Sequence, residues 1–161
     1  MTRIILWWTF LGAVLLAFSP IMPARAADWK TRYDFGIPID PKSAEAKNGR
    51  RIDVVIANGS MFYSIKEIKI KKGEVINFVI HNNDKLLHEF VLGSDESVAY
   101  EREEQAEGEE HTGPEPIYEV EIKPHQVGTL TWKFTEAGKF NYVCLQPLHY
   151  EQGMKGRIIV K

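Results

Sequence analysis

Cysteine is nearly absent from this sequence, which contains one, Cys144, among its 161 residues. A single cysteine excludes an intrachain disulfide framework, a CxxC redox pair and a four-cysteine zinc or iron–sulfur site. It also excludes a binuclear copper centre that needs two bridging thiolates. Any chemistry of Cys144 therefore takes place without a second cysteine from the same chain.

The sequence also lacks a strong excess of charge. A formal net charge of −2 argues against a nucleic-acid-binding protein, which usually presents a strongly basic face, so no nucleic-acid partner is expected. With 161 residues, of which 44% are hydrophobic, the chain has enough material for one domain of ordinary size. It has too little for two well-packed domains and their linkers.

Only one long apolar run is present, near the start of the chain. Arg3 precedes fifteen largely apolar residues, 4–18, and the small residues of Ala24-Arg25-Ala26 follow. This order is typical of a secretory signal peptide, so we predict cleavage after residue 26 and export to the periplasm. The alternative is an uncleaved anchor, but fifteen residues fall short of the roughly 20 that span a bilayer. We therefore expect no membrane span after cleavage.

Cleavage changes the composition of the mature chain. It removes Arg3 and Arg25 but no acidic residue, so 18 basic residues face 22 acidic ones and the net charge becomes −4. Two methionines remain, Met61 and Met154. Because an exported protein meets oxidising conditions, its lone cysteine needs protection by burial or by metal ligation.

The remaining sequence has the pattern of short β-strands and no amphipathic helix of consequence. Residues 27–50 contain two prolines and a polar stretch, and we expect an N-terminal extension that Trp29, Tyr33 and Phe35 attach to the domain surface. Seven or eight strands at a spacing of about 8–12 residues predict an all-β sandwich over residues 51–161. The expected strands are 51–57, 68–71, 75–81, 88–92, 118–122, 129–135, 140–143 and 155–160.

An acidic insert interrupts this strand pattern at about residues 95–116. Its residues 95–110 carry eight acidic side chains and one basic side chain, Arg102, for a net charge of −7. We expect a loop or a short helix here. The insert is either a solvated segment, which is the usual role of a charge run, or a docking surface for a basic partner.

Metal-binding side chains are concentrated near the C-terminus, where Cys144, His149 and Met154 follow a C-x₄-H-x₄-M pattern. Phe140, Tyr142 and Cys144 share one face of their strand, so the thiol is expected to point to the packed side. A thiolate, an imidazole and a thioether within eleven residues suit copper, which changes between Cu(I) and Cu(II).

A trigonal copper site needs a second imidazole, and His88 is the candidate because it begins a predicted strand directly after the turn at residues 82–85. Two histidines, one cysteine and a weak axial methionine are the ligands of a blue-copper electron-transfer site. We therefore predict that His88, Cys144, His149 and Met154 bind one copper ion. Each residue alone has a structural alternative, as a buried core cysteine, a strand histidine or a packing methionine.

Three further histidines have no place in this pattern. His81 and His125 are expected to be structural or exposed. His111 lies among the acidic residues of the insert, where it is either solvated or part of a weak second metal site.

Residues 51–161 resemble the cupredoxins, the copper proteins of the plastocyanin/azurin kind. The residues that carry the resemblance are Asn82-Asn83 before His88, then Tyr142, Cys144, Pro147 and His149, then Gly153-Met154 and Gly156. Together with the run His88–Gly93 they are most similar to small periplasmic cupredoxins associated with copper tolerance. The resemblance implies a Greek-key sandwich, strong copper binding by the histidines and the cysteine, axial binding by Met154, and electron entry at the ring edge of His149.

The sequence departs from this family at two points. The insert is rich in glutamate, whereas copper-tolerance cupredoxins often carry Met- and His-rich stretches, and this difference counts against a role in copper storage. Leu148 stands where azurin-like loops usually have glycine. Its side chain either crowds the edge of His149 or extends an apolar docking patch.

These observations predict a periplasmic mononuclear type 1 copper protein that transfers single electrons and is not an enzyme. The alternative is a copper-tolerance or copper-handling protein that uses the same site. A remote alternative is a cysteine-dependent enzyme, but Met154 has no role in it and the copper site offers no vacant position to a substrate. We expect a monomer, with a redox protein such as a basic cytochrome docking near His149 or near Glu101–Glu110.

Overall fold

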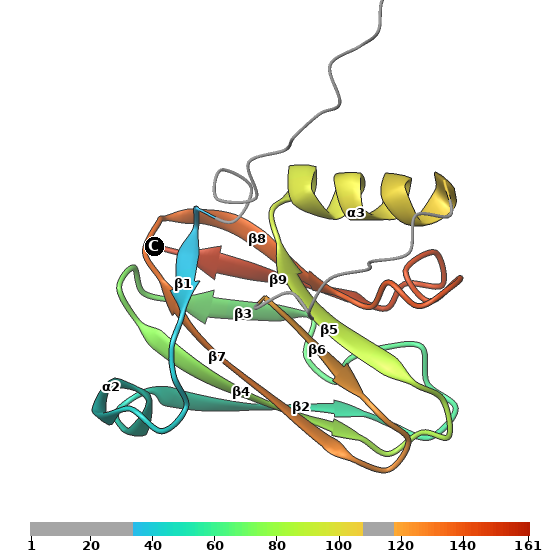
Figure 1. Ribbon diagram of the computed structural model, residues 1–161, viewed down its shortest axis with the longest axis horizontal. Helices are drawn as coiled ribbons and strands as arrows, with labels where there is room; N and C mark the ends of the chain where they lie inside the picture. The colour runs from blue at the N-terminus through green and yellow to red at the C-terminus, as the bar shows by residue number, and fades with distance from the viewer. Residues whose placement is uncertain (1–33, 108–117) are drawn as a thin grey trace, which may run out of the picture.

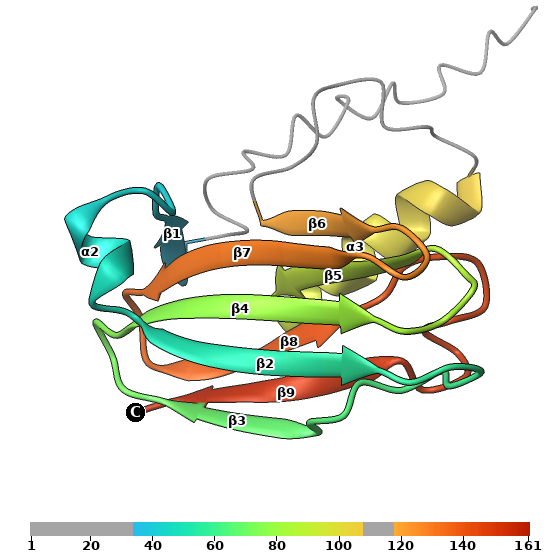
Figure 2. The ribbon, with the colours of Figure 1, turned by 90° about the horizontal axis from the view of Figure 1, so that it is seen from below.

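The computed structural model describes residues 34–107 and 118–161, which form a sandwich of two β-sheets (Figures 1 and 2). The nine strands of these residues confirm the all-β sandwich, with one strand more than the expected upper number. The predicted signal peptide and His111 lie outside the described residues. No helix within the described ranges is long and apolar enough to cross a membrane.

The first sheet has four strands in the order β1-β7-β4-β2. β2 and β4 are parallel, whereas β7 pairs antiparallel with both β4 and β1. Strand β4 lies in the middle of this sheet and is buried along nearly its whole length, which explains its almost unbroken apolar sequence. The bounds are β1 Gly36–Pro38, β2 Arg50–Ile56, β4 Val75–Asn82 and β7 Val127–Phe134.

The second sheet has five strands in the order β3-β9-β8-β5-β6. β3 is parallel to β9, and the other neighbours are antiparallel. All six residues of β5 are buried, since this strand lies inside the sheet and helix α3 packs against it. The bounds are β3 Glu67–Ile70, β5 His88–Gly93, β6 Glu119–Ile122, β8 Gly138–Val143 and β9 Lys155–Val160.

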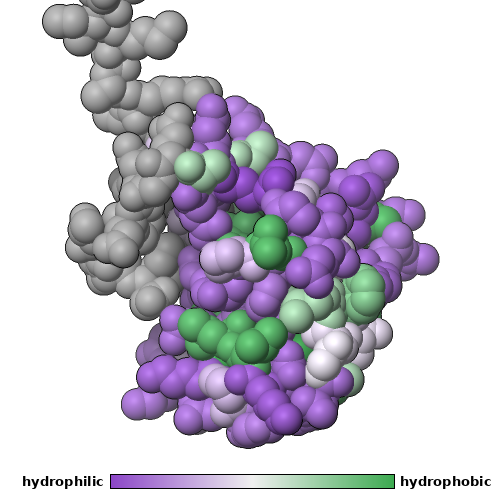
Figure 3. All heavy atoms as spheres, turned by 90° about the vertical axis from the view of Figure 1, so that its right-hand side faces the viewer, coloured by the Kyte–Doolittle hydropathy of each residue, from purple (hydrophilic) through white to green (hydrophobic). Residues whose placement is uncertain are grey.

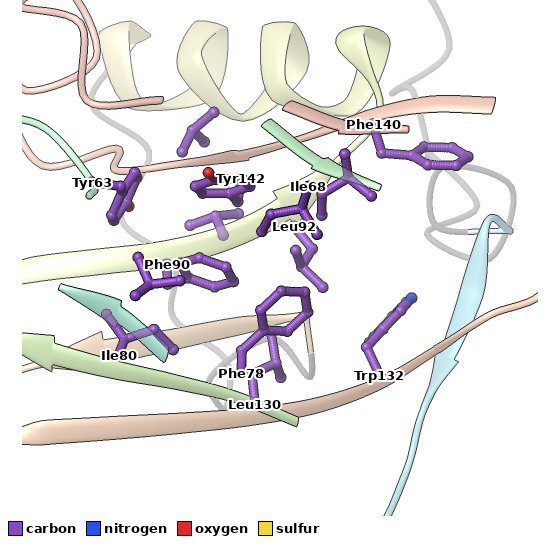
Figure 4. Close-up of a cluster of buried hydrophobic side chains, with 14 of the residues drawn as sticks. Tyr63, Ile68, Phe78, Ile80, Phe90, Leu92, Leu130, Trp132, Phe140 and Tyr142 are labelled. Carbon is purple, nitrogen blue, oxygen red and sulfur yellow. The ribbon is translucent and has the colours of Figure 1, made fainter. Parts of the chain in front are cut away.

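Aromatic rings from the two sheets meet in the core (Figure 4). The ring of Phe78 on β4 lies 5.1 Å from that of Phe90 on β5, and Phe90 stacks on Tyr142 of β8 at 5.1 Å. Tyr63, from the loop between β2 and β3, packs against both Phe90 and Tyr142. Its hydroxyl donates a hydrogen bond to the backbone carbonyl of Glu89, so the core also holds the beginning of β5 in place.

Residues 34–50, part of the expected N-terminal extension, contribute a strand and a core residue. Strand β1 pairs with β7, and the side chain of Phe35 beside it is 1% exposed. The Phe35 ring lies 4.6 Å from Phe140 and 5.4 Å from Trp132, so it bridges the two sheets. A three-residue strand with two exposed residues has no alternation that a sequence pattern can reveal. After it, Ser43 caps the short helix α2 (Ala44–Lys47) by accepting a hydrogen bond from the Ala46 N–H.

The acidic insert begins with a helix, α3 (Asp95–Glu107), which lies beside β5 and β8 (Figure 1). Ser94 stands directly before it, and its hydroxyl accepts a hydrogen bond from the Ser97 N–H at 3.0 Å. Asp95 and Glu96 in the first turn interact favourably with the positive end of the helix. Of the two forms expected for the insert, the structure therefore shows a helix of 13 residues over 95–107, and the rest of the insert lies outside the described residues.

We predict that Phe35→Ala lowers the free energy of unfolding by about 3–5 kcal/mol, because it removes a buried ring and leaves a cavity between the sheets. Chemical denaturation of the purified protein measures this loss. Ile37→Ala is the matched control, since Ile37 lies two residues away and is 50% exposed, and it should change the value by about 0.5 kcal/mol or less. Equal losses for the two substitutions would show that the buried ring of Phe35 contributes no more to stability than the exposed side chain of Ile37.

Candidate metal centre

Three of the four predicted ligands meet at one end of the sandwich. His88 is the first residue of β5, Cys144 directly follows β8, and His149 lies in the loop that leads to β9. Because β5 and β8 are antiparallel neighbours, the start of one lies beside the end of the other. One ligand atom from each residue lies within 4.8 Å of the other two, and all three residues are buried.

Backbone hydrogen bonds close the ligand loop, residues 144–154, and place Met154 next to the other predicted ligands. The Cys144 N–H donates to the Met154 carbonyl at 3.0 Å, and the Met154 N–H donates to the His149 carbonyl at 2.9 Å. Met154 is fully buried. Axial ligation by its sulfur stays a prediction.

Two residues of the ligand loop have left-handed backbone conformations. Gly153 has a φ of 100°, which glycine adopts without steric cost. Leu148 has a φ of 70°, a conformation that a leucine adopts only with strain. A glycine would adopt this conformation without strain. The Leu148 side chain is 67% exposed.

The Cys144 thiol lies in an environment that disfavours its ionisation. Burial raises the pKa of the thiol to about 12, and this effect outweighs the backbone N–H groups of Glu89 and Gln146, which lower it. A catalytic cysteine needs the opposite, a lowered pKa that supplies a nucleophilic thiolate near neutral pH. A bound metal ion is able to displace the proton from such a thiol, so this environment favours metal ligation over nucleophilic catalysis.

Glu89 forms hydrogen bonds with the residues around the Cys144 sulfur, and the sequence analysis did not identify it as a site residue. Its backbone N–H donates to the Cys144 sulfur at 3.3 Å. Its carboxyl group accepts hydrogen bonds from the Leu145 N–H, at 3.1 Å, and from the Gln146 side chain. The available signal was a charged residue in an otherwise apolar strand, directly after a predicted ligand.

The hydrogen bonds of His88 leave one ring nitrogen for a metal. Its Nε2 lies 3.1 Å from Oδ2 of Asp84, a buried residue of the turn between β4 and β5. Its Nδ1 is also buried and has no hydrogen-bond partner among residues 34–107 and 118–161. A buried nitrogen without a partner is costly unless something binds it, and a metal ion beside Cys144 and His149 would do so. The residues present therefore fit a copper ion.

His149 completes the cluster as a neutral imidazole. Its Nδ1 lies 3.3 Å from the Cys144 sulfur, and its ring lies 4.9 Å from the ring of His88. Burial lowers the pKa of His149, and the neighbouring His88 lowers it further. Metal ligands must be unprotonated, and the lowered pKa keeps His149 unprotonated at neutral pH, where it is able to bind a metal ion.

The other described histidines lie away from the cluster. His81 is a partly exposed residue of β4 that pairs with Asp53 of β2 at 2.8 Å. His125 is exposed in the turn before β7, with a φ of 59°. Within the described ranges, His88, Cys144 and His149 form the one group of three or more side chains suited to a metal ion.

Helix α3 is attached to the ligand loop through Arg102, the single basic residue of the insert. The Arg102 guanidinium lies 2.8 Å from the Glu151 carboxylate and 4.2 Å from the centre of the Tyr150 ring. Lys155 lies 4.0 Å from the centre of the same ring. The acidic helix is thus held beside the residues that directly follow His149.

Comparisons with known proteins agree with this geometry. A family model described as copper binding proteins, plastocyanin/azurin family, matches residues 50–161. The chain is 33% identical to the copper-resistant cuproprotein CopI of Rubrivivax gelatinosus, over 80% of this chain and 77% of that protein. It is 29% identical to the protein of the same name from Pseudomonas aeruginosa, over 94% and 92% of the two chains.

The fold of this chain is also similar to that of solved structures. The reduced auracyanin of Roseiflexus castenholzii matches with a TM-score of 0.59 and 24% identity, over 70% of this chain and 98% of that one. Auracyanin B matches with a TM-score of 0.60 and 19% identity, over 77% and 94% of the two chains. At these identities the likeness supports the fold alone.

We predict that acid releases the bound metal as His149 gains a proton. Because the folded protein holds the pKa of this imidazole below its ordinary value of about 6.5, the proton competes with the metal only under more acidic conditions. Copper occupancy, measured after equilibration with a chelator across a pH series, should fall with a midpoint below pH ~6.5. A midpoint above that value would contradict this assignment.

Proposed function

Because this chain belongs to the plastocyanin/azurin family of copper-binding proteins, we propose that it exchanges single electrons at a mononuclear type 1 copper centre and serves copper resistance. The observation that carries the proposal is the buried cluster of His88, Cys144 and His149, with ligand atoms within 4.8 Å of one another. We assign Met154 as the weak axial ligand. This ligand set is the one that blue-copper sites use.

The folded chain holds the predicted ligand residues in place before the metal binds. Bound copper supplies a one-electron couple between Cu(I) and Cu(II). The paired strands β5 and β8 hold His88 and Cys144, and the backbone bonds of the ligand loop hold His149 and Met154. Burial of these side chains keeps bulk water from the site. Since the four side chains would fill the coordination sphere, the site leaves no open position for a substrate, and we propose no catalytic activity.

We propose that electrons enter and leave through His149, which lies in the loop at the end of the sandwich. Exposed apolar side chains lie in the loops of the same end, and Figure 3 shows this side of the molecule with separate apolar patches in a mainly hydrophilic surface. These side chains are Phe62, Leu86 and Leu148.

The basic redox partner remains a prediction, with docking near His149 or near the acidic insert. The attachment of α3 to the ligand loop through Arg102 supports it, because it holds acidic side chains close to the centre. Such a complex should weaken as salt is added, since salt screens the attraction between exposed charges.

Copper resistance is the biological use that the relatives favour, since two of them are named copper-resistant cuproproteins. The glutamate-rich insert has no methionine and a single histidine, His111, where a storage segment would need many such side chains, so we propose a role for a single copper ion and not a storage role. Resistance of this kind would operate in the periplasm, which is the destination that the predicted signal peptide implies.

We predict that Cu(II), added to the purified apo protein, produces an intense visible band from charge transfer between the Cys144 thiolate and copper. Cys144→Ser should abolish the band, because the hydroxyl does not replace the thiolate. Met154→Leu is the matched control, since it keeps the thiolate and both imidazoles and should shift the band without removing it. A colourless wild-type protein, or colour that survives Cys144→Ser, would refute the proposed centre.

A second experiment tests the biological use. Deletion of the gene in its own host should lower the copper concentration that the cells tolerate, because the copper-binding protein is lost. The wild-type gene should restore growth, whereas the Cys144→Ser gene should not. Met61→Leu is a control outside the predicted ligand set and should restore growth. If deletion instead impairs an electron-transfer chain and leaves copper tolerance unchanged, the resistance role is wrong.

A further inference from the structure

Asp84 is a buried carboxylate in direct contact with a predicted copper ligand. It lies in the turn between β4 and β5 and is 3% exposed. Its Oδ1 accepts hydrogen bonds from the backbone N–H groups of Gly59, at 2.9 Å, and Lys85, at 2.8 Å. Its Oδ2 lies 3.1 Å from Nε2 of His88. Both carboxylate oxygens are therefore held, one by the backbone and one by the imidazole.

These contacts determine which nitrogen of His88 carries the proton. The backbone N–H groups of Gly59 and Lys85 both donate to Oδ1 of Asp84, which favours the ionised carboxylate, a group that acts only as an acceptor. The His88 Nε2 must then donate. In a neutral imidazole the other nitrogen, Nδ1, keeps its lone pair, and this is the buried nitrogen without a hydrogen-bond partner in the described part of the chain.

The charge of Asp84 has a second consequence at the metal. Within residues 34–107 and 118–161, His88 is the one basic side chain within ion-pair distance of this carboxylate, so no lysine or arginine side chain neutralises it there. Solvent screens the carboxylate little, because its side chain is 4% exposed. A negative charge that acts through the imidazole makes the nitrogen a stronger donor and stabilises the more highly charged state of the metal.

We propose that Asp84 is a positioning residue that holds His88 in the metal-binding tautomer and biases the centre toward Cu(II) over Cu(I). The bias toward Cu(II) rests on the proposed copper function, whereas the tautomer of His88 is a property of the apo protein. Asp84 thereby makes the turn between β4 and β5 part of the centre, although this turn contributes no ligand itself.

The chain offers a matched control in a second Asp–His pair. Asp53 Oδ1 lies 2.8 Å from Nε2 of His81, so the contact has the same chemistry. This pair lies on the partly exposed surface of β2 and β4, with side-chain exposures of 45% for Asp53 and 32% for His81. Neither residue belongs to the cluster of predicted ligands. Asp53→Asn therefore removes the same charge and the same type of contact away from the centre.

The test compares Asp84→Asn with Asp53→Asn in the full chain. An asparagine whose carbonyl keeps the two backbone hydrogen bonds presents its NH₂ group to His88, so Nε2 must accept and the proton moves to Nδ1. Nitrogen-15 NMR of the apo protein should show the Nε2–H tautomer of His88 in the wild type and in Asp53→Asn, and a shift toward Nδ1–H in Asp84→Asn. An unchanged tautomer in Asp84→Asn would overturn the positioning role.

The copper-loaded proteins give the second measurement. Asp84→Asn should weaken Cu(II) binding by about 10–100-fold. It should also raise the reduction potential by about 59 mV, which corresponds to a tenfold loss of preference for Cu(II) over Cu(I). Asp53→Asn should leave both values at those of the wild type. Equal potentials in the two variants would overturn the bias toward Cu(II).

The outcomes separate this inference from the proposed function. If the wild-type protein binds no copper, the proposed function fails, while the NMR comparison still decides the tautomer. If copper binds and the potential does not respond to Asp84→Asn, only the inference fails. Should Asp84→Asn not fold, Asp84→Ser replaces it, because serine removes the charge and keeps an acceptor for the backbone. The same rise in potential is then expected.

Discussion

The pairing of β5 with β8 is the constraint on which the centre depends. Their antiparallel register brings Val91 opposite Val143, so the residues that precede Val91 lie beside those that follow Val143. Glu89 is thereby placed to donate its N–H to the Cys144 sulfur and to accept the Leu145 N–H with its carboxyl group. The aromatic core behind these strands fixes that register, because a shift by one residue would turn Phe90 and Tyr142 away from it.

The same constraint explains why the centre suits a metal. Paired strands and a closed loop bring a thiol and two imidazoles together in a buried site with little access to water. Burial makes the thiol hard to ionise and His149 hard to protonate, and one nitrogen of His88 has no hydrogen-bond partner among the residues that the structure describes. Polar groups in this condition are costly, and a bound copper ion would satisfy all of them at once.

Much of the fold followed from local patterns. Strands such as β7, with its alternating Leu130, Trp132 and Phe134, were predictable because one face of a strand packs on the core and the other faces outward. Strand β1 was not, since its anchor Phe35 is a single aromatic residue whose partners lie about a hundred residues away. The length of α3 also escaped prediction, because an acidic helix with few buried residues lacks the apolar periodicity that identifies a helix.

The sequence by itself determined the class of metal and predicted the ligand types, because Cys144, His149 and Met154 lie close together in the chain and His88 begins a recognisable strand. Only the tertiary structure showed what surrounds these ligands. The roles of Asp84 and Glu89 depend on hydrogen bonds to Gly59, His88, Leu145 and Gln146. Several of these bonds join residues that are distant in the chain, and no local pattern records them. The physical reason is that ligand identity is a property of side chains, whereas protonation and charge at a buried site depend on the neighbours that folding brings to it.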